Sequence, residues 1–370
     1  MKKKLLMTAL AGAALLAACG ATPAAPPTVA PATKPAATAV PAATTAPAAP
    51  AATTAPAAPA AGTVRVGYVP VSINYPMYVA LEKGYFKEQG LTVELLPTDG
   101  GSDAVVQVAS GNFEASGSGI AASMLNAVQR GIEFEIAASL HTERPKVASP
   151  LVVSKKRFDS GELTKIADLK GKKVATNNRG TATEWWLYTA LQKGGLDVKD
   201  VEIIGMPFQN IGAALENGGL DGAILTEPFA TAAEDKGLIK RLSEDFISDF
   251  YPTYVYFNKK WSTDNPAKAQ GFVKAFLKAA RDLQGDKRYD PANLAILSKW
   301  TKTDVEVLKR LPLPYFDPNG GVPIADIMTL QTFYRKQGLL NYPTDLDMNK
   351  FVNRGYVETA LKEMGKVDMK

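Results

Sequence analysis

The order of apolar and polar positions predicts strands that alternate with helices from residue 63 onward. Val64–Val69 alternates into an apolar run, which is typical of a half-buried strand. Pro76 begins a segment with apolar residues at helical spacing, and proline suits the first position of a helix. Further strands are expected at Leu91–Leu96, Phe113–Ser116 and Glu133–Leu140. This alternation indicates a mainly parallel sheet covered by helices.

The same pattern starts again near residue 148 and predicts a second α/β lobe. Strands are expected at Ala148–Ser154, Val174–Asn177, Val201–Gly205 and Leu220–Leu225. Between them, a helix that carries two consecutive tryptophans opens at Gly180-Thr181. A late strand at Tyr254–Phe257 precedes a helix that begins at Asn265-Pro266 and has a clear apolar face. We therefore expect an α/β protein with two lobes.

The first nineteen residues have a different pattern. Lys2, Lys3 and Lys4 precede an apolar run, Leu5–Leu16. That run is shorter than the roughly 20 residues that a membrane-spanning helix needs, and it is typical of a secretory signal. It ends in Leu-Ala-Ala-Cys19-Gly, which resembles a bacterial lipobox. We expect residues 1–19 to be a lipoprotein signal segment, with acylated Cys19 as a lipid anchor on the extracytoplasmic face of the cell membrane.

Residues 20–62 contain only Ala, Pro, Thr, Val, Lys and Gly. Such a segment cannot bury enough apolar surface to offset the entropy of ordering it, and its prolines favour an extended spacer. It is therefore predicted to be a disordered tether. Of the remainder, we assign residues 63–142 and 255–370 to lobe one and residues 143–254 to lobe two.

Composition excludes several classes of function. Cys19 is the only cysteine, so neither an intrachain disulfide nor a cysteine-based metal cluster can form. The net charge of +5 includes the three signal lysines, and the remaining Lys and Arg are interspersed with Asp and Glu, which argues against a nucleic-acid partner. His141, the only histidine, is expected to form a hydrogen bond in the hinge and not to bind metal. We predict a monomer with no catalytic residues, no metal and no cofactor.

Several segments together resemble the type II solute-binding proteins of ABC importers: Ala80–Glu94, Ile166–Val174, Leu220–Phe229 and Asn265-Pro266. Within that family the chain is most similar to the branch that binds thiamine pyrimidines, riboflavin and alkanesulfonates or taurine. The resemblance implies a two-lobed type II periplasmic-binding-protein fold (a Venus flytrap) with two crossing segments. It also implies delivery to an ABC permease and its ATPase. We expect the first crossing near His141–Lys146 and the return near Tyr251–Tyr254.

The candidate site follows from the rule that ligands bind beyond the carboxyl ends of strands, where helices begin. Tyr75, Tyr78, Trp185 and Phe229 would supply stacking faces, and Asn74, Asn177, Asn178 and Glu227 would supply hydrogen bonds. Trp185 and Trp186 point about 100° apart on one helix, so at least one is expected to pack on the sheet. The full set is Ser72, Asn74, Tyr75, Tyr78, Gly101, Ser102, Ser118, Asn177, Thr181, Thr183, Trp185, Glu227 and Phe229.

These residues favour a flat, weakly charged heterocycle, with riboflavin first and a thiamine-pyrimidine precursor second. A sulfonate such as taurine is the alternative, because helix N-termini attract anions. Asp103 and Glu184 argue against it, since each lies in the first turn of a candidate helix. A superfamily enzyme such as a pyrimidine synthase is the other class considered. Those enzymes hold iron with a cysteine-rich segment and histidines, whereas the part after residue 62 has no cysteine and one histidine, so it lacks those ligands.

Overall fold

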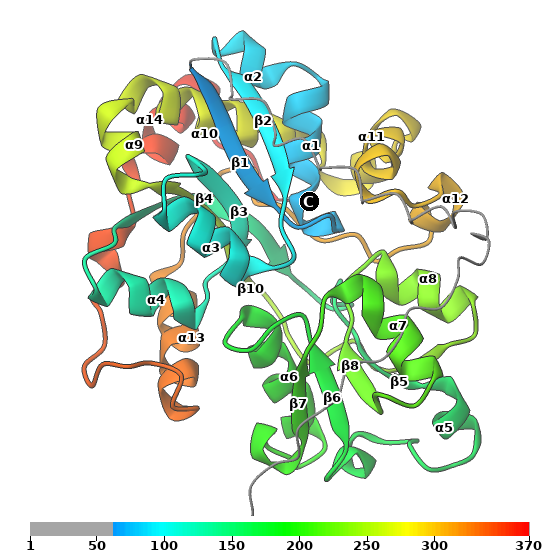
Figure 1. Ribbon diagram of the computed structural model, residues 1–370. Coiled ribbons are helices and arrows are strands. Elements are labelled where there is room, and N and C mark those ends of the chain that lie inside the picture. The colour runs from blue at the N-terminus through cyan, green and yellow to red at the C-terminus, as the bar shows by residue number, and fades with distance from the viewer. Residues whose placement is uncertain (1–61, 370) are drawn as a thin grey trace, which may run out of the picture. The chain divides into compact units, whose positions relative to one another are not determined.

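The structure is a computed structural model that describes residues 62–369, so the expected signal segment, Cys19 and most of the tether lie outside the described residues. Two five-stranded sheets form the framework of the described part, and each has helices packed against it (Figure 1). We call the part built on the first sheet lobe one and the part built on the second sheet lobe two. Among these residues, no helix is long and apolar enough to cross a membrane.

The first sheet has the order β2-β1-β3-β10-β4. β1 pairs in parallel with β2 and β3, whereas β10 runs antiparallel to β3 and β4 because it returns from lobe two. The expectation of a mainly parallel sheet therefore holds only for its first three strands. The strands are β1 (Thr63–Tyr68), β2 (Thr92–Pro97), β3 (Ala115–Gly119), β4 (Phe134–Glu143) and β10 (Phe250–Asn258).

The second sheet has the order β7-β6-β8-β5-β9, with β6 parallel to both of its neighbours. β5 is antiparallel to β8 and β9, and the pattern along the chain did not predict β9. The strands are β5 (Leu151–Ser154), β6 (Lys173–Thr176), β7 (Glu202–Gly205), β8 (Gly222–Ile224) and β9 (Ile239–Ser243). Its helices are α5 (Lys155–Asp159), α6 (Ala182–Lys193), α7 (Phe208–Glu216) and α8 (Phe229–Asp235).

Lobe one takes its helices from both ends of the described chain. The N-terminal group is α1 (Tyr75–Glu82), α2 (Tyr85–Glu88), α3 (Gly101–Ala109) and α4 (Ala122–Gln129). The C-terminal group is α9 (Lys259–Asp264), α10 (Pro266–Asp282), α11 (Pro291–Thr301), α12 (Val305–Leu308), α13 (Ile324–Lys336) and α14 (Gly355–Met364). Short 3₁₀ turns occupy Ser72–Asn74, Ile166–Leu169, Val198–Asp200, Gly285–Tyr289 and Met348–Phe351.

α10 shows how the apolar pattern builds the core of lobe one. Phe272, Val273 and Phe276 recur at helical spacing and are all buried. The Phe272 ring packs against Phe86 of α2, with 4.8 Å between the ring centroids, and edge-on against Phe257 of β10. Burial of one such side chain stabilises the fold by about 1.5–3 kcal/mol. The helix thereby joins the C-terminal segment to the first sheet.

Two segments connect the sheets, one after β4 and one before β10. β10 begins at Phe250, so the return to lobe one lies at residues 244–249, just before the expected Tyr251–Tyr254. The two strands are bonded together at this point. A ring nitrogen of His141 shares a hydrogen bond with the Thr253 hydroxyl, and the Thr142 hydroxyl donates to the Phe250 carbonyl at 3.0 Å.

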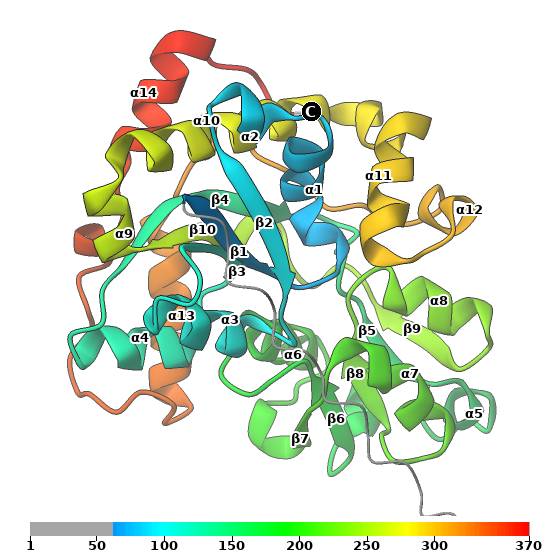
Figure 2. The same cartoon turned by 45° about the horizontal axis from the view of Figure 1, so that its top comes forward.

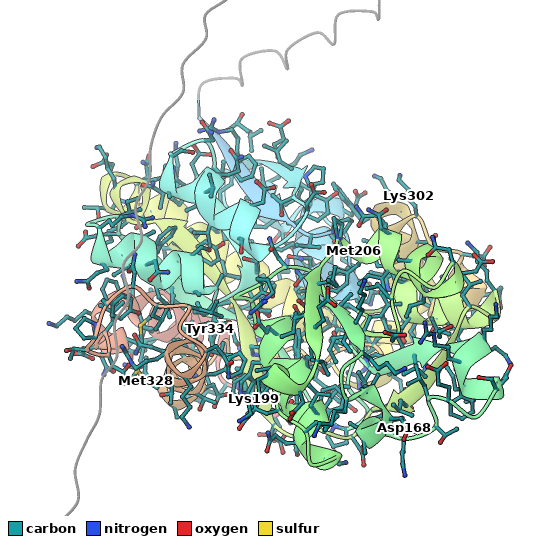
Figure 3. All side chains as sticks on the ribbon, turned by 60° about the horizontal axis from the view of Figure 1, so that its bottom comes forward. Asp168, Lys199, Met206, Lys302, Met328 and Tyr334 are labelled. Carbon is teal, nitrogen blue, oxygen red and sulfur yellow. The ribbon has the colours of Figure 1, made fainter. Side chains whose placement is uncertain are left out.

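α13 contacts both lobes. The Tyr334 hydroxyl donates to the carbonyl of Ile120 in lobe one at 2.7 Å, and the Phe333 ring lies 5.3 Å from the ring of Tyr188 on α6. Figure 3 shows Tyr334 and Met328 on this helix, with Lys199 of lobe two nearby. Met328 and Lys199 line the same groove between α6 and α13. α13 is therefore a third connection between the lobes.

Candidate ligand-binding site

A cavity lies between the lobes, where strand ends and helix starts of both sheets meet. Its volume, counted as the space that the centre of a water molecule can occupy, is about 40 Å³. One water needs roughly 10–15 Å³ on this scale, so the cavity has room for a few waters or one compact polar group. Lobe one contributes Val69, Val71, Ile73, Gly101, Ser118, Gly119 and Thr253, and lobe two contributes Asn177, Thr181, Ala182, Thr183, Trp186, Phe208 and Thr226.

Hydroxyl groups and one amide form the polar part of the wall. The Thr181 hydroxyl donates to the Asn177 side-chain oxygen at 3.0 Å, and the Thr183 hydroxyl also donates to that oxygen. These bonds fix the orientation of the Asn177 side-chain amide, so its nitrogen can donate a hydrogen bond to a ligand. Ser118 shares a 2.9 Å hydrogen bond with the buried Tyr256 hydroxyl. Among the described residues that line the cavity, none carries a formal charge.

Two helices begin at this cavity, α3 at Gly101 and α6 at Ala182, and the views in Figures 1 and 2 place both starts at the boundary between the sheets. Neither N-cap residue, Gly100 or Thr181, provides a side-chain cap bond. First-turn amides have no intrahelical acceptor, and they carry the positive end of the helix dipole. The cavity therefore presents several hydrogen-bond donors and a favourable field for negative charge.

Glu184 does not occupy this space, although it lies in the first turn of α6. Its buried carboxylate turns back along the loop and accepts from the Gly180 amide at 2.7 Å and the Arg179 guanidinium at 3.1 Å. Asp103 is half-buried on α3, and it is not among the lining residues. Neither acid lines the cavity, but the buried Glu184 carboxylate still places a negative charge in the first turn of α6, and one of its oxygens has no partner within the described residues.

Trp186 supplies a further donor. Its side chain is 3% exposed and lines the cavity, and its indole nitrogen has no hydrogen-bond partner within the described residues. An indole nitrogen can only donate, and an unpaired buried donor costs about 1–3 kcal/mol. A ligand acceptor that reached this nitrogen would remove the cost.

Trp185 faces another space. Its ring stacks on Phe250 with 4.0 Å between centroids, and it lines the groove between α6 and α13. This placement corrects the expectation that Trp185 faces the cavity. The physical reason is that α6 is packed on opposite sides, by α13 on one and by the sheet and cavity on the other. Trp186 takes the inner position.

Tyr75 and Tyr78 also lie outside the cavity, contrary to expectation. Tyr75 donates to the Arg288 carbonyl at 3.1 Å, and Tyr78 donates to the Val69 carbonyl at 3.1 Å. The Tyr78 ring stacks on Trp300 at 5.3 Å. Both are fully buried because α1 lies between α10 and α11, and burial raises the pKa of each hydroxyl well above its usual value. They stabilise lobe one.

Ser72, Asn74 and Ser102 surround the cavity without lining it. The amide and hydroxyl of Ser72 both donate to the backbone carbonyl of Glu227 in lobe two, at 3.3 and 3.1 Å. Asn74 donates to the Val69 carbonyl at 3.1 Å, and its side-chain oxygen is buried without a partner within the described residues. Ser102 is half-buried next to Gly101. These residues shape the wall.

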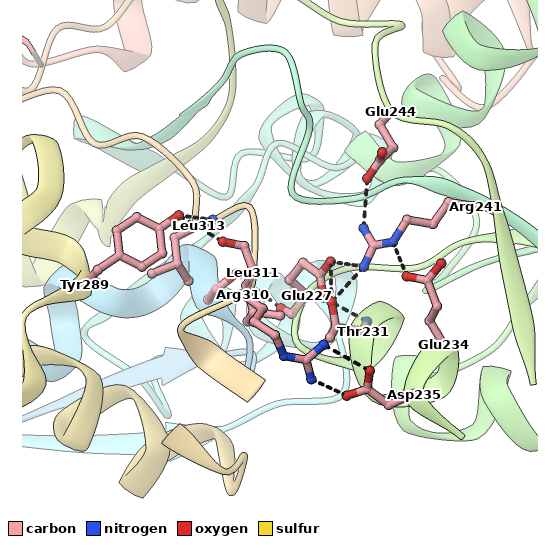
Figure 4. A network of polar contacts seen from close by, with 11 residues as sticks. Glu227, Thr231, Glu234, Asp235, Arg241, Glu244, Tyr289, Arg310, Leu311 and Leu313 are labelled. Atoms are coloured by element: carbon pink, nitrogen blue, oxygen red, sulfur yellow. Dashed lines mark hydrogen bonds and ion pairs between the residues drawn. The ribbon is translucent and has the colours of Figure 1, made fainter. Parts of the chain in front are cut away.

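The Glu227 carboxylate points into an ion-pair network of lobe two (Figure 4). Arg241 contacts Glu227 at 2.6 Å, Glu234 at 2.7 Å and Glu244 at 3.0 Å. Burial raises the pKa of the Glu227 carboxyl, while Arg241 acts in the opposite direction. The Glu227 carboxylate is bound by Arg241 and does not line the cavity. The expectation that it forms hydrogen bonds with the edge of a ligand is therefore wrong. Phe229 lies outside the cavity and stacks on Phe208, with centroids 6.4 Å apart.

Five residues of the predicted set line this cavity: Gly101, Ser118, Asn177, Thr181 and Thr183. The lining residues that the predicted set does not include are Val69, Val71, Ile73, Gly119, Ala182, Trp186, Phe208, Thr226 and Thr253. Phe208 follows β7, so the rule about carboxyl ends of strands could have identified it. Thr253 lies inside β10, and no local signal marks it.

Comparison with known proteins gives the family. The model of the NMT1-like family matches residues 57–301. The chain belongs to the NMT1-like family.

Relatives of this NMT1-like protein include binding proteins for chemically different solutes. The taurine-binding periplasmic protein of Escherichia coli (strain K12) is 29% identical over 289 residues, which cover 76% of this chain and 81% of that protein. The riboflavin-binding protein RibY of Chloroflexus aurantiacus is 23% identical over 313 residues, which cover 79% of this chain and 86% of that protein. The same fold occurs in the alkanesulfonate-binding protein SsuA from Xanthomonas axonopodis pv. citri bound to MOPS. That structure has a TM-score of 0.66 and 18% identity over 80% of this chain and all of that one.

These findings confirm the type II periplasmic-binding-protein fold expected for this NMT1-like chain. They also confirm the broad class of function. The protein is a solute-binding component of an ABC importer, and the solute is a small molecule.

Proposed function

We propose that the protein captures a compact ligand with an oxyanion head, of the alkanesulfonate class, and delivers it to the permease. The observation that carries this proposal is the convergence of donors on one cavity. Two helix starts, at Gly101 and Ala182, meet there beside the amide of Asn177 and the side chain of Trp186, whose buried indole nitrogen has no partner within the described residues. A sulfonate offers three acceptor oxygens and a negative charge, which such donors and helix dipoles favour.

The size of the cavity supports the same class. About 40 Å³ suits a sulfonate head, whereas a three-ring flavin needs the lobes to lie farther apart. The absence of a lining cation, among the described residues, does not oppose an anion, because buried amides and hydroxyls can bind it through dipoles alone.

A flat heterocycle is the second candidate, with riboflavin before a thiamine-pyrimidine precursor. It is favoured by the two aromatic rings that line the cavity, Trp186 and Phe208. Aromatic faces of this kind stack on planar ligands. Of the four residues first expected to supply such faces, none lines the cavity.

Closure of the lobes couples binding to delivery. In the closed arrangement, the Ala122 amide donates to the Gly180 carbonyl at 2.8 Å across the lobes, and Ser72 contacts Glu227 in the same way. A ligand that touches both walls binds the closed form more tightly and therefore shifts the protein toward it. The closed form would then be the one that engages the permease and its ATPase.

Membrane attachment through Cys19 completes the proposal. The lipobox-like sequence before Cys19 supports acylation, and several acyl chains anchor a protein stably. Growth with labelled fatty acid should label the wild-type chain, whereas Cys19→Ala should remain unlabelled and be found in the soluble extract. A labelled Cys19→Ala chain would contradict the anchor.

The ligand class is tested by thermal unfolding of the purified full chain with propanesulfonate, taurine, riboflavin or a thiamine pyrimidine. A ligand at a hundred times its dissociation constant stabilises the fold by about 2.7 kcal/mol. We expect a rise in melting temperature with at least one sulfonate and none with riboflavin. If the melting temperature rises only with riboflavin or the thiamine pyrimidine, the sulfonate proposal is wrong and a flat heterocycle is the ligand.

A further inference from the structure

Three buried polar side chains form a row from the end of β4 to the cavity between the lobes. Glu143 and His141 lie two residues apart on β4, and Thr253 is the partner of His141 on the neighbouring strand β10. One ring nitrogen of His141 contacts a Glu143 carboxylate oxygen at 3.3 Å, and the other shares a hydrogen bond with the Thr253 hydroxyl. All three side chains are at most 2% exposed.

His141 lies directly behind the wall of the cavity. Its hydrogen-bond partner Thr253 lines the cavity, and so does Trp186, whose ring centroid lies 6.3 Å from that of His141. His141 is not itself a lining residue. A charge on its ring would therefore act on a bound ligand across a layer one side chain thick. Such a charge acts strongly there, because the surroundings are buried and little water screens it.

Glu143 gives a protonated His141 ring a partner for its charge. The Glu143 carboxylate accepts from the Ala148 amide at 3.0 Å, and His141 is its one ionic partner within the described residues. Buried charges are costly unless they are paired and hydrogen-bonded. A protonated His141 would form a buried ion pair with Glu143, so that neither charge is left alone.

Protonation of His141 also changes what Thr253 offers. The protonated ring has two N–H donors and no acceptor, so one donates to Glu143 and the other to the Thr253 oxygen. The hydroxyl hydrogen of Thr253 is then no longer held by the ring. In the neutral ring that donates to Glu143, the second nitrogen accepts that hydrogen instead. The protonated form therefore adds a positive charge behind the wall and frees a donor on a lining residue, and both favour an oxyanion.

Most of the other charged side chains near His141 are already in ion pairs. They come from the two crossing segments, the loop before α8 and the first turn of α6, and the pairs are Arg144–Asp249, Arg241–Glu227 and Arg179–Glu184. Burial raises the pKa of Tyr251 and Tyr254 on β10 above the usual 10, so neither changes charge near neutral pH. Asp326 of α13 has no ionic partner within the described residues. Its carboxyl accepts from the Tyr251 amide at 2.8 Å, and burial raises its pKa.

We propose that His141 is a positioning residue for the ligand, and that an anion in the cavity binds together with a proton on His141. This inference rests on the proposed function, because it assumes an oxyanion head in the cavity. A bound anion favours the charged ring, so the complex holds more protons on average than the free protein. The affinity should therefore be highest at low pH and fall as pH rises through the range in which His141 loses its proton.

Titration calorimetry of propanesulfonate into the wild-type full chain tests this linkage over about pH 5 to 8, where histidine ordinarily titrates. The dissociation constant should rise by about five- to tenfold over this range, the lower end of typical coupling between two sites. At the middle of the rise, buffers with different heats of ionisation should reveal net proton uptake on binding. His141 is the only histidine of the chain, so its ring gives one set of NMR signals. Their titration midpoint should be higher with propanesulfonate than without it.

His141→Gln carries no charge at any pH, so its affinity for propanesulfonate should be lower at the acid end of the range and should not change with pH. Asp326→Asn is the matched control and should keep the pH dependence of the wild type. If His141→Gln fails to fold, the proton uptake and the NMR midpoint of the wild type decide.

Binding without proton uptake, and with the same midpoint in the free and bound chain, would overturn the inference and leave the proposed function standing. Loss of the pH dependence in Asp326→Asn but not in His141→Gln would overturn it as well. No binding of propanesulfonate at any pH would instead refute the oxyanion site itself.

Discussion

Trp185 and Trp186 are neighbours on α6, yet their rings face different spaces. Trp186 lines the cavity between the lobes with its indole nitrogen unpaired within the described residues, and Trp185 stacks on Phe250 in the groove beside α13. The same substitution, Trp to Phe, can therefore be made at two neighbouring positions of α6. One position lines the proposed ligand cavity and the other does not.

Trp186→Phe should weaken sulfonate binding by about tenfold, because one hydrogen bond of roughly 1–1.5 kcal/mol is lost. Stability without ligand should stay the same or rise, since the unpaired buried donor is removed. Calorimetry and thermal unfolding measure the two effects. Trp185→Phe is the control and should leave affinity unchanged. Equal losses in both variants would mean that Trp186 acts through the packing of α6 and not on the ligand.

A prediction about closure concerns Arg310 and Asp235. The Arg310 guanidinium of lobe one contacts both carboxylate oxygens of Asp235 in lobe two, at 2.6 and 3.2 Å. The pair joins the lobes only when they are closed. Arg310→Ala should therefore raise the dissociation constant of the ligand, by at most about fivefold because the pair is exposed. Lys309→Ala, whose partner Glu306 lies in the same lobe, should have no effect.

The exchanged pair Arg310→Asp with Asp235→Arg should recover most of the lost affinity. Recovery would separate the interlobe contact from local changes in either lobe. A double variant no better than Arg310→Ala would show that the ion pair does not stabilise the closed form.

A prediction about acid stability concerns Glu135 on β4. Burial raises the pKa of its carboxyl, but bonds from Lys259, Ser262 and Tyr356 act more strongly together and lower the pKa below its usual 4.5. A lowered pKa means that the stabilisation is complete above 4.5 and is lost as pH falls through the folded-state value. Glu135→Gln should reduce the free energy of unfolding by roughly 1–3 kcal/mol at neutral pH, the range for bonds to charged groups.

The deficit of Glu135→Gln should begin to shrink below pH 4.5, where this carboxyl takes up a proton in the unfolded chain, and should disappear at the lower pH at which the folded wild-type carboxyl is protonated too. Denaturant unfolding at a series of pH values measures this. Glu133→Gln, an exposed residue just before the same strand, should follow the wild-type curve. If the free energy of unfolding of Glu135→Gln stays below that of the wild type by the same amount down to pH 3, the loss comes from the changed shape of the side chain and not from its lost charge.

Much of the fold was predictable because local pattern and tertiary structure agree. The alternation at Val64–Val69 became β1, and the apolar face of the helix after Asn265 became the buried side of α10. β9 was missed because only its first residue, Ile239, is buried, so its sequence has no clear apolar pattern. Its Arg241 then pairs with Glu227, fourteen residues earlier, and no spacing rule predicts that contact.

Site residues could be predicted where the end of a strand fixes their position. They could not be predicted where the rotation of a helix about its axis decides which side chain faces the cavity. Thr181 and Thr183 open a helix at the carboxyl end of β6, so their place in the cavity follows from topology. Trp185 and Trp186 are both buried, so amphipathicity does not tell which ring faces inward. Tyr78 was expected to supply a stacking face, but its ring stacks on Trp300 of α11.

The most direct test of the central claim is titration of a sulfonate into a chain whose cavity is filled. A β-carbon at Gly101 would meet its neighbours at ordinary contact distance, 3.6 Å from the Gly119 carbonyl oxygen, so Gly101→Leu places its larger side chain in the cavity without strain at the backbone. The wild-type chain should bind propanesulfonate, and Gly101→Leu should unfold at the same temperature but give no binding heat. Equal affinity in the two chains would show that the ligand binds elsewhere and would contradict the account.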